Sequence, residues 1–564
     1  MKINPGKRVF CLLAVLMGAA VLVLVPGMAL VRQDAPPPSE APPLSAEVEK
    51  GDPKIEHALF MFHKIFQTQG LEKAREFAEH RRMDLEDDRV LVLVESHASP
   101  AAEMGGDPVP FIMGQIAFLG GDVKTRYEGQ VEARMPAAGL LELAANPLVK
   151  FVRLPLKPQP LAVTSEGVSL TGANLWHDLE PYRTASSGLK VCILDLGFKD
   201  YASLLGTELP SSVRTRSFRT DGNLSAGSVH GTACAEIVHD MAPDAELYLV
   251  NFSTELQHRQ AVDWLISEGV DVISYSIAWF NAGDGRGTGP ICEPVKKASD
   301  NGILWAAAAG NYAEDHWEGT YYTSDGDWWH NFDGADEILQ FYVPAYTPVG
   351  AFLNWDDWGY WNGTSYGGSD QDYDLELYIW TGSYWYYVDG SYGWQSGSQW
   401  PTEAIGYWQA TLGAYWGVAI YEWNATRNCK LELFIGGNSS AIEFCVPEGS
   451  ITVPADSPHI IAVGATDAVS DNYHSYSSLG PTHDGRIKPD FCAPSGVSTA
   501  TYGTRNFYGT STCGPHMAGG LALMKGMTPY SWSQVRTILE ERAVDKGDPG
   551  KDNRYGIGRL NLKR

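Results

Sequence analysis

Two kinds of hydrophobic pattern alternate between about residues 190 and 311. Short continuous apolar runs are typical of strands buried on both faces. Between them, apolar residues recur every three or four positions, as in amphipathic helices. Alternating strands and helices predict a parallel sheet with helices on both faces. The predicted strands are 189–196, 245–252, 270–280 and 302–311, with a helix from His230 and others over 259–268 and 293–301.

The stretches before and after this region carry different patterns. Residues 50–160 predict a small α+β domain, with strands at 89–96, 128–135 and 148–156 and helices at 111–119 and 136–147. This order suggests a ferredoxin-like arrangement. The α/β pattern resumes at 459–466 and continues with a helix after Ser511.

Residues 317–444 are dense in Trp, Tyr, Gly and Ser. Short alternating runs at 374–380, 416–423 and 430–437 are separated by turn residues, a spacing typical of β-sandwiches. We expect an α/β domain with a parallel sheet in two parts, 161–316 and 445–564, interrupted by an antiparallel β-sandwich.

The N-terminus has the layout of an export signal. Lys2, Lys7 and Arg8 precede an apolar run that extends to about Val25. Residues 1–31 are therefore either a signal peptide or a membrane anchor, and the Pro-rich residues 32–49 form a linker. Both alternatives place the rest of the chain outside the cytoplasm, in the extracellular space or the cell envelope.

The charge and the cysteines narrow the function classes. A net charge of −26 repels phosphate backbones, which argues against nucleic-acid binding. None of the eight cysteines forms a CxxC pair, which argues against a zinc site. Cys429 and Cys445 flank a predicted strand and could pair in an oxidising compartment.

Three residues combine into a candidate catalytic set. Asp195 ends a predicted strand, where sites form in parallel sheets, and His230 and Ser511 each open a predicted helix. Singly, each has a common structural explanation, such as a helix cap or a loop residue. Together they supply a nucleophile, a base and a carboxylate to orient the base, in the chain order Asp, His, Ser that is documented for subtilisin.

The sequence resembles the subtilase family of serine proteases over about residues 173–562, apart from the insertion. The matching motifs are VCILDLGF around Asp195, HGTACAEI at 230–237, AAAGN at 307–311, SSLGPTHDGRIKPDFCAPS at 477–495 and GTSTCGPHMAG at 509–519.

The resemblance implies a secreted serine endopeptidase that acts on polypeptides and needs no cofactor for its chemistry. Ser511 would be the nucleophile, His230 the general base and acid, Asp195 its orienting carboxylate and Asn311 an oxyanion donor. The resemblance further implies substrate-binding residues at Ser276, Ile277, Ala278 and Gly310.

The same resemblance gives the N-terminal domain a role. Residues 50–160 would be a propeptide, an intramolecular inhibitor that is removed by self-cleavage between about Pro155 and Ser165.

Three features depart from the family pattern. Glu236 replaces a small residue in the histidine helix. Cys513, two residues after the nucleophile, stands where the family usually has Ala or Ser. In the segment SIAW, Ala278 and Trp279 stand where the family has glycines. Their side chains would either narrow the cleft or belong to a buried strand end.

Asp370, Asp372 and Asp374 alternate in the insertion and could bind a structural calcium ion; the alternative is solvated carboxylates at a strand edge. An alternative function is a binding module on an inactive protease scaffold, with the β domain carrying the activity. A lipase-type hydrolase lacks support because no GxSxG elbow surrounds Ser511.

Overall fold

A computed structural model describes residues 51–81, 83–97, 107–156, 159–160, 167–177, 184–438, 440–527 and 531–563. The predicted export segment and the Pro-rich linker lie outside these ranges. Within them, no helix is both long and apolar enough to cross a membrane.

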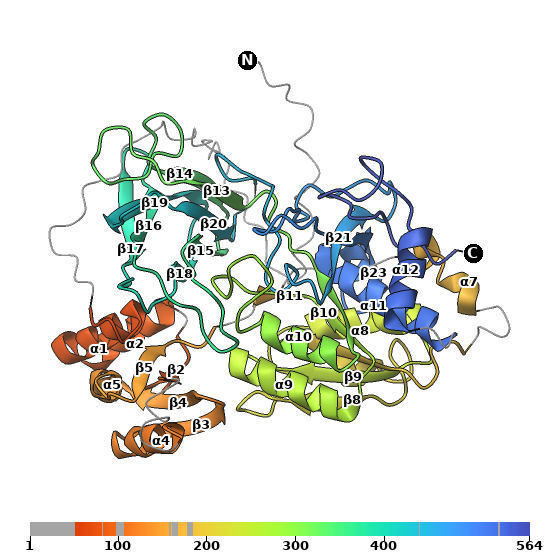
Figure 1. Cartoon of the computed structure of the whole chain (residues 1–564), viewed down its shortest axis with the longest axis horizontal. Helices are drawn as coiled ribbons and strands as arrows, with labels where there is room; N and C mark the ends of the chain where they lie inside the picture. Colours follow the sequence, from red (N-terminus) through yellow and green to blue (C-terminus); the bar gives the residue numbers. More distant parts are fainter. Residues whose placement is uncertain are drawn as a thin grey trace, which may run out of the picture. The chain divides into compact units, whose positions relative to one another are not determined.

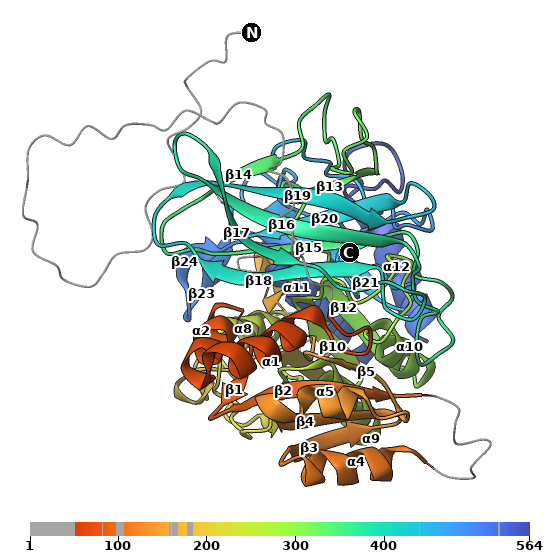
Figure 2. The same ribbon diagram turned by 90° about the vertical axis from the view of Figure 1, so that its left-hand side faces the viewer.

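The N-terminal domain, residues 51–156, is an α+β unit (Figure 2). Strand β2 pairs antiparallel with β4 and β5, and β4 pairs with β3, so the order is β5-β2-β4-β3. This order with intervening helices is ferredoxin-like. The elements are α1 (His57–Gln69), α2 (Leu71–His80), β1 (Leu85–Glu86), β2 (Arg89–Ser96), α4 (Val109–Phe118), β3 (Asp122–Tyr127), β4 (Gln130–Pro136), a 3₁₀ helix η2 (Ala137–Gly139), α5 (Leu140–Ala144) and β5 (Val149–Arg153).

The core of this domain lies on one face of its sheet. Val90, Val92 and Val94 alternate along β2 and therefore share that face. They pack against buried side chains of α1, α4 and α5. The predicted strand at 89–96 is thus confirmed to the residue, whereas the predicted helix at 136–147 is only the short η2 and α5.

A seven-stranded parallel sheet forms the centre of the α/β domain, in the order β22-β21-β12-β10-β7-β9-β8. Helices cover both of its faces (Figure 1). The strands are β7 (Lys190–Asp195), β8 (Arg214–Ser217), β9 (Glu246–Asn251), β10 (Val272–Tyr275), β12 (Leu304–Ala308), β21 (Ile461–Asp467) and β22 (Phe491–Ser495). The helices are α8 (His230–Met241), α9 (Glu255–Glu268), α10 (Cys292–Asp300), α11 (Cys513–Gly526) and α12 (Trp532–Arg542).

Smaller elements complete this domain. They are β6 (Gln159–Pro160), α6 (Val168–Thr171), α7 (Asn174–His177), a 3₁₀ helix η3 (Tyr201–Leu204), β11 (Ile277–Ala278), the hairpin β23 (Val497–Thr499) and β24 (Gly503–Phe507), and a 3₁₀ helix η4 (Thr510–Thr512).

The central strand β7 shows why the sheet is buried on both faces. Val191 and Ile193 belong to one core, which includes α8 and α11. Cys192 and Leu194 point the other way, into a core with α9 and α10. Because both sets are apolar, the strand has no polar face, as the continuous apolar run predicts.

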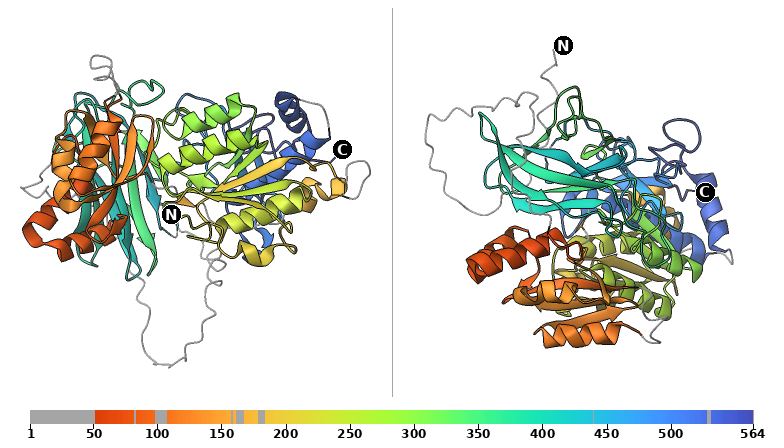
Figure 3. Two further views of the ribbon diagram at one scale, coloured as in Figure 1. Left: turned by 90° about the horizontal axis from the view of Figure 1, so that it is seen from below. Right: turned by 60° about the vertical axis from the view of Figure 1, so that its left-hand side comes forward.

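The insertion is a sandwich of two antiparallel four-stranded sheets, β13-β20-β15-β18 and β14-β19-β16-β17 (Figure 3). Apolar side chains from both sheets form its core. The strands are β13 (His316–Thr320), β14 (Leu339–Val343), β15 (Pro348–Trp355), β16 (Asp372–Trp380), β17 (Trp385–Ser391), β18 (Thr402–Gln409), β19 (Ala414–Asn424) and β20 (Lys430–Gly436). The β-sandwich prediction is confirmed.

The proposed pairing of Cys429 with Cys445 is wrong, because both are free thiols. The Cys429 carbonyl accepts from the Tyr321 N–H beyond one end of β13. The Cys445 thiol donates to the Ala313 carbonyl, 3.1 Å away, before its other end. The five residues of β13 span about 17 Å, whereas a disulfide requires Cα atoms within about 7 Å.

Candidate functional site

Asp195 and His230 form a buried pair at the carboxyl edge of the parallel sheet. Asp195 is the last residue of β7, and His230 is the first residue of α8. His230 Nδ1 lies 2.8 Å from Asp195 Oδ2, and the other carboxylate oxygen accepts the Leu196 N–H at 2.7 Å. The pair is 1–2% exposed, so a carboxylate shielded from water orients the imidazole.

Ser511 lies in η4, directly before α11, and is buried. Two different elements hold its carbonyl oxygen. The Ser276 hydroxyl donates to it at 2.8 Å, and the Cys234 thiol, one turn after His230 on α8, donates to it at 3.7 Å. Ser511 is thereby fixed beside the helix that begins with His230.

Asn311 is tied to the turn that carries Ser511. Its Oδ1 accepts both the N–H and the hydroxyl of Thr510, each at 2.8 Å. Because two donors hold the oxygen of the amide, the oxygen faces Thr510 and the NH₂ group is the end that can donate elsewhere in the site. The Thr510 hydroxyl also accepts the Gly310 N–H at 3.2 Å. This bond joins the segment after β12 to the turn that carries Ser511.

Asp195, His230 and Cys234 have potential ligand atoms within 4.8 Å of one another. Burial and the nearby Asp195 charge raise the pKa of the Cys234 thiol well above its ordinary value. The thiol donates to the Ser511 carbonyl, so in this structure Cys234 serves as a hydrogen-bond donor to the turn that carries Ser511.

Glu236, a departure from the family pattern, has a structural explanation. Its carboxylate accepts the Ala500 N–H at 2.6 Å and a hydrogen bond from the Thr501 hydroxyl. These contacts tie α8 to the turn between β23 and β24. Phe507, on β24, packs edge-on against the His230 ring at 6.1 Å, so Glu236 supports the hairpin that contacts the candidate base.

The four predicted substrate-binding residues lie near Ser511. The Ser276 hydroxyl donates a hydrogen bond to the Ser511 carbonyl, and Ile277 and Ala278 form the short strand β11 directly after Ser276. Gly310 has a φ of +120°, and a Cβ there would lie 2.5 Å from the Ser478 hydroxyl. Because a side chain would be strained and crowded at this position, glycine is required.

The side chain of Trp279 lies in the protein core and not in the cleft. It is 1% exposed, stacks on Phe252 at 6.1 Å, and its indole N–H donates to the Tyr275 hydroxyl at 2.8 Å. Ala278 points the other way, toward Ala308. Of the two alternatives from the sequence, a buried strand end is therefore confirmed for Trp279.

Strand β11 has a partner from outside the α/β sheet. Residues Gln159 and Pro160 form β6, which pairs antiparallel with β11 in the register Pro160 to Ile277 and Gln159 to Ala278. An extended segment of the chain itself therefore pairs with the strand that is predicted to bind substrate. Most of the remaining predicted cleavage segment, at 157–158 and 161–165, lies outside the described residues.

The N-terminal domain also contacts the start of α9. The Thr254 hydroxyl caps this helix and donates to Glu132 Oε2 at 2.7 Å, and Gln257 Nε2 lies 3.4 Å from Glu132 Oε1. Burial, opposed by these hydrogen bonds and assisted by the charge of Glu255, raises the pKa of Glu132 to about 7.

The three predicted calcium ligands differ in their surroundings. Asp372 and Asp374 lie on β16 and are buried, whereas Asp370 precedes the strand and is exposed. Among the described residues, these three do not form a group with all ligand atoms within 4.8 Å of one another. Asp325, Asp327 and Glu337 do form such a group.

Sequence reasoning missed the helix start at Thr254 and Glu255, because the predicted helix began at residue 259. The signal was present: a threonine followed three residues later by Gln257 is typical of a helix N-terminus. Cys234 and Thr510 were missed as partners of the site because their contacts depend on the three-dimensional packing of α8, η4 and β12.

The fold and the site define an α/β protein with a buried Asp–His pair at the carboxyl edge of its parallel sheet and with Ser511 held beside the helix that carries the histidine. The model of the Subtilase family matches residues 186–352 and 407–558, together more than half of the chain. The chain belongs to the subtilase family.

Individual relatives match shorter stretches. Subtilisin Savinase of Lederbergia lenta is 37% identical over 142 residues, 25% of this chain and 47% of Savinase. Bacillopeptidase F of Bacillus subtilis (strain 168) is 30% identical over 185 residues, 31% of this chain and 12% of that protein. The chain therefore spans less than half the length of each.

Among solved structures, the Clostridium perfringens CspB protease has a TM-score of 0.47 and 15% identity, covering 70% of this chain and 97% of CspB. The epidermin leader peptide processing serine protease EpiP of Staphylococcus aureus has a TM-score of 0.44 and 12% identity, covering 84% of this chain and 97% of EpiP.

The position of Trp279 generates a prediction about stability. Trp279→Ala should lower the free energy of unfolding by about 3–5 kcal/mol, because it leaves a large cavity in the core. Urea unfolding measures the change. A variant as stable as its parent would contradict the buried position.

Proposed function

We propose that this chain is an exported serine endopeptidase, made as an inactive precursor, that hydrolyses peptide bonds through an acyl-enzyme on Ser511. The observation that carries the proposal is the 2.8 Å contact between the buried Asp195 carboxylate and His230 Nδ1, next to Ser511, in a member of the subtilase family. Export is included because residues 1–31 have the layout of a signal peptide or anchor.

In the proposed reaction, His230 Nε2 takes the hydroxyl proton of Ser511 as its oxygen attacks the carbonyl carbon of the substrate. The tetrahedral intermediate collapses, and the leaving amine takes the proton from His230. Water then attacks the acyl-enzyme, again giving a proton to His230, which returns it to Ser511 as the acid product leaves. Asp195 stabilises the imidazolium in both halves.

The developing oxyanion would be stabilised by the amide NH₂ of Asn311 and the backbone N–H of Ser511. The two hydrogen bonds from Thr510 to Asn311 Oδ1 support this role because they fix which end of the amide is the donor. The proposed chemistry uses groups of this chain alone and needs no cofactor. A calcium ion at Asp370, Asp372 and Asp374 stays a structural prediction.

We further propose that the N-terminal domain is an inhibitor that the enzyme removes by self-cleavage. The antiparallel pairing of β6 with β11 supports this, because peptides commonly bind by adding a strand to an exposed edge. Glu132 contacts α9, and a buried ion pair joins Arg81 to Asp389 of the insertion. The domain would thus be held by both the α/β domain and the sandwich.

The catalytic proposal is tested with a fluorophosphonate probe, which labels activated serines. Fully processed wild type should be labelled, and the matched Ser511→Ala variant should not, because the reagent needs that nucleophile. Mass spectrometry of the labelled peptide should locate the adduct on residues 509–519. Processed wild type that resists labelling would favour the binding-module alternative.

Self-cleavage makes a prediction about the mature N-terminus. Since Gln159 and Pro160 pair with the predicted substrate-binding strand, the scissile bond should be the bond that follows Pro160 or a later one up to Ser165. N-terminal sequencing of the active enzyme should therefore begin between residues 161 and 165. Active enzyme with an intact terminus upstream of residue 100 would contradict the propeptide role.

Retention of the cleaved N-terminal domain should depend on pH through Glu132. Its pKa is about 7 in the docked state and about 4.3 when exposed, so docking takes up a proton. The Glu132 contribution is complete below about pH 4 and is lost as the pH rises through 7, up to about five-hundredfold in affinity, of which about thirtyfold falls between pH 5.5 and pH 8. Gel filtration of the processed protein at pH 5.5 and pH 8 measures co-elution.

The control for this experiment is Glu132→Gln, which carries no titrating proton at this position and should change less in co-elution between the two pH values than wild type. Glu56, whose pKa burial also raises to about 7, accounts for the change that remains. If wild-type retention is the same at pH 5.5 and pH 8, Glu132 does not govern docking.

A further inference from the structure

The guanidinium group of Arg153, at the end of β5, contacts all three parts of the protein. Its Nε donates to Glu95 of the N-terminal domain at 2.8 Å, and its Nη2 donates to Glu255, the first residue of α9. Its Cζ lies 5.3 Å from the ring centroid of Trp400 in the insertion. Arg153 is buried, so this cation is held in a fully formed site.

Two of the residues that contact Arg153 lie outside the N-terminal domain: Glu255 on α9 and Trp400 in the insertion. Glu255 is completely buried, and its hydrogen-bond partners among the described residues are Arg153 Nη2 and the Leu156 N–H, 2.6 Å from Oε2. Both partners precede the proposed cleavage point. After cleavage and release, the carboxylate would lose both partners and face solvent or a new ligand.

Trp400 supplies the aromatic wall. It is packed against Trp358 and Tyr366, with ring centroids 5.8 and 5.9 Å away, so its own position does not depend on the N-terminal domain. A carboxylate combined with an indole face suits a guanidinium group, which hydrogen-bonds in its plane and stacks on aromatic rings.

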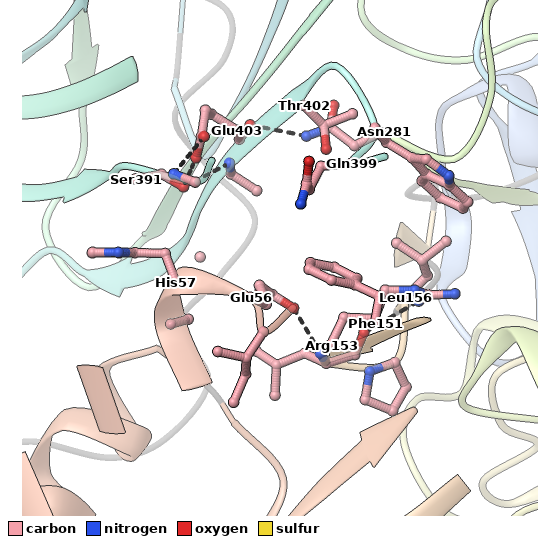
Figure 4. Close-up of a pocket in the computed structure, with 18 of the residues that line it drawn as sticks. Glu56, His57, Phe151, Arg153, Leu156, Asn281, Ser391, Gln399, Thr402 and Glu403 are labelled. Carbon is pink, nitrogen blue, oxygen red and sulfur yellow. Dashed lines mark hydrogen bonds between the residues drawn. The ribbon is translucent and has the colours of Figure 1, made fainter. Parts of the chain in front are cut away.

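A cavity of about 470 Å³ adjoins this site (Figure 4). Arg153 and Leu156 line it from the N-terminal domain, Asn281 from the α/β domain, and Trp400 and Glu403 from the insertion. Removal of the N-terminal domain would open this cavity between the walls that remain, and both acidic and aromatic side chains would line it.

The path of the chain connects the site to the cleft. Only two residues separate Leu156 from Gln159 on β6, which pairs with the predicted substrate-binding strand β11. A polypeptide substrate that occupies β11 in the same direction would therefore extend upstream past Glu255 and Trp400.

We propose that Glu255 and Trp400 form a substrate subsite for an arginine side chain several residues upstream of the scissile bond. The proposal rests on the proposed function, with Arg153 of the precursor occupying the subsite before cleavage. The inserted sandwich thus contributes directly to substrate selection, and arginine is preferred to lysine because of its planar, stacking head group.

The experiment uses mature enzyme and peptides with the chain's own sequence at 150–166. One peptide is unchanged and the other carries Arg153→Gln. The unchanged peptide should have a kcat/KM about tenfold to a hundredfold higher, as expected for hydrogen bonds to a charged group. A peptide with Arg153→Lys should fall between the two.

Enzyme variants assign the preference to the site. In Glu255→Gln, the ratio between the unchanged and Arg153→Gln peptides should fall close to one, and Trp400→Leu should reduce it in part. Glu268→Gln, at the other end of α9 and about 20 Å away, is the matched control and should keep the wild-type ratio. If Glu255→Gln slows both peptides equally, Glu255 is merely structural and the proposal is overturned.

A short peptide covering residues 158–166 separates the two proposals. If it is hydrolysed but the long peptides are cleaved alike, the subsite is wrong and the protease assignment stands. If neither the short peptide nor the long peptides are hydrolysed by processed enzyme, the proposed function fails and the subsite fails with it.

Discussion

The parallel register of β7, β10 and β12 is the constraint on which the rest of the site depends. Because these strands are direct neighbours, the residues that follow their carboxyl ends must lie at one edge of the sheet. Asp195, Ser276 and Asn311 each come from such an end. Two contacts then hold the turn before α11 at this edge. The Cys234 thiol, on the helix that begins with His230, donates to the Ser511 carbonyl, and the Thr510 N–H donates to Asn311.

The sandwich insertion leaves this register intact because the segments that enter and leave the insertion are hydrogen-bonded to each other. The chain leaves the sheet after β12 and returns to it at β21, and these two strands pair directly. At the base of the sandwich, β13 pairs with β20, and the Val446 N–H donates to the His316 carbonyl. The entering and leaving segments are thus held together, so a large domain is added without separating adjacent strands of the sheet.

The sequence allowed the sheet, the sandwich and the Asp–His pair to be predicted, because each depends on local periodicity or on residues at strand and helix ends. Side-chain direction was harder to predict where a strand is interrupted. Between β10 and β11 the chain breaks at Ser276, so alternation could not decide whether Trp279 faces the cleft or the core. Glu255 could not be recognised either, because an acidic residue in the first turn of a helix commonly has only an electrostatic role. Its contact with Arg153 joins residues that are about a hundred positions apart.

The seven cysteines that the structure describes are all free thiols, and six of them are buried. Burial raises the pKa of the Cys513 thiol, two residues from Ser511, to about 12, so it stays neutral and weakly reactive. The described fold therefore owes none of its stability to covalent cross-links. Its cohesion comes from the noncovalent packing of the two cores on either face of the parallel sheet and of the core of the sandwich.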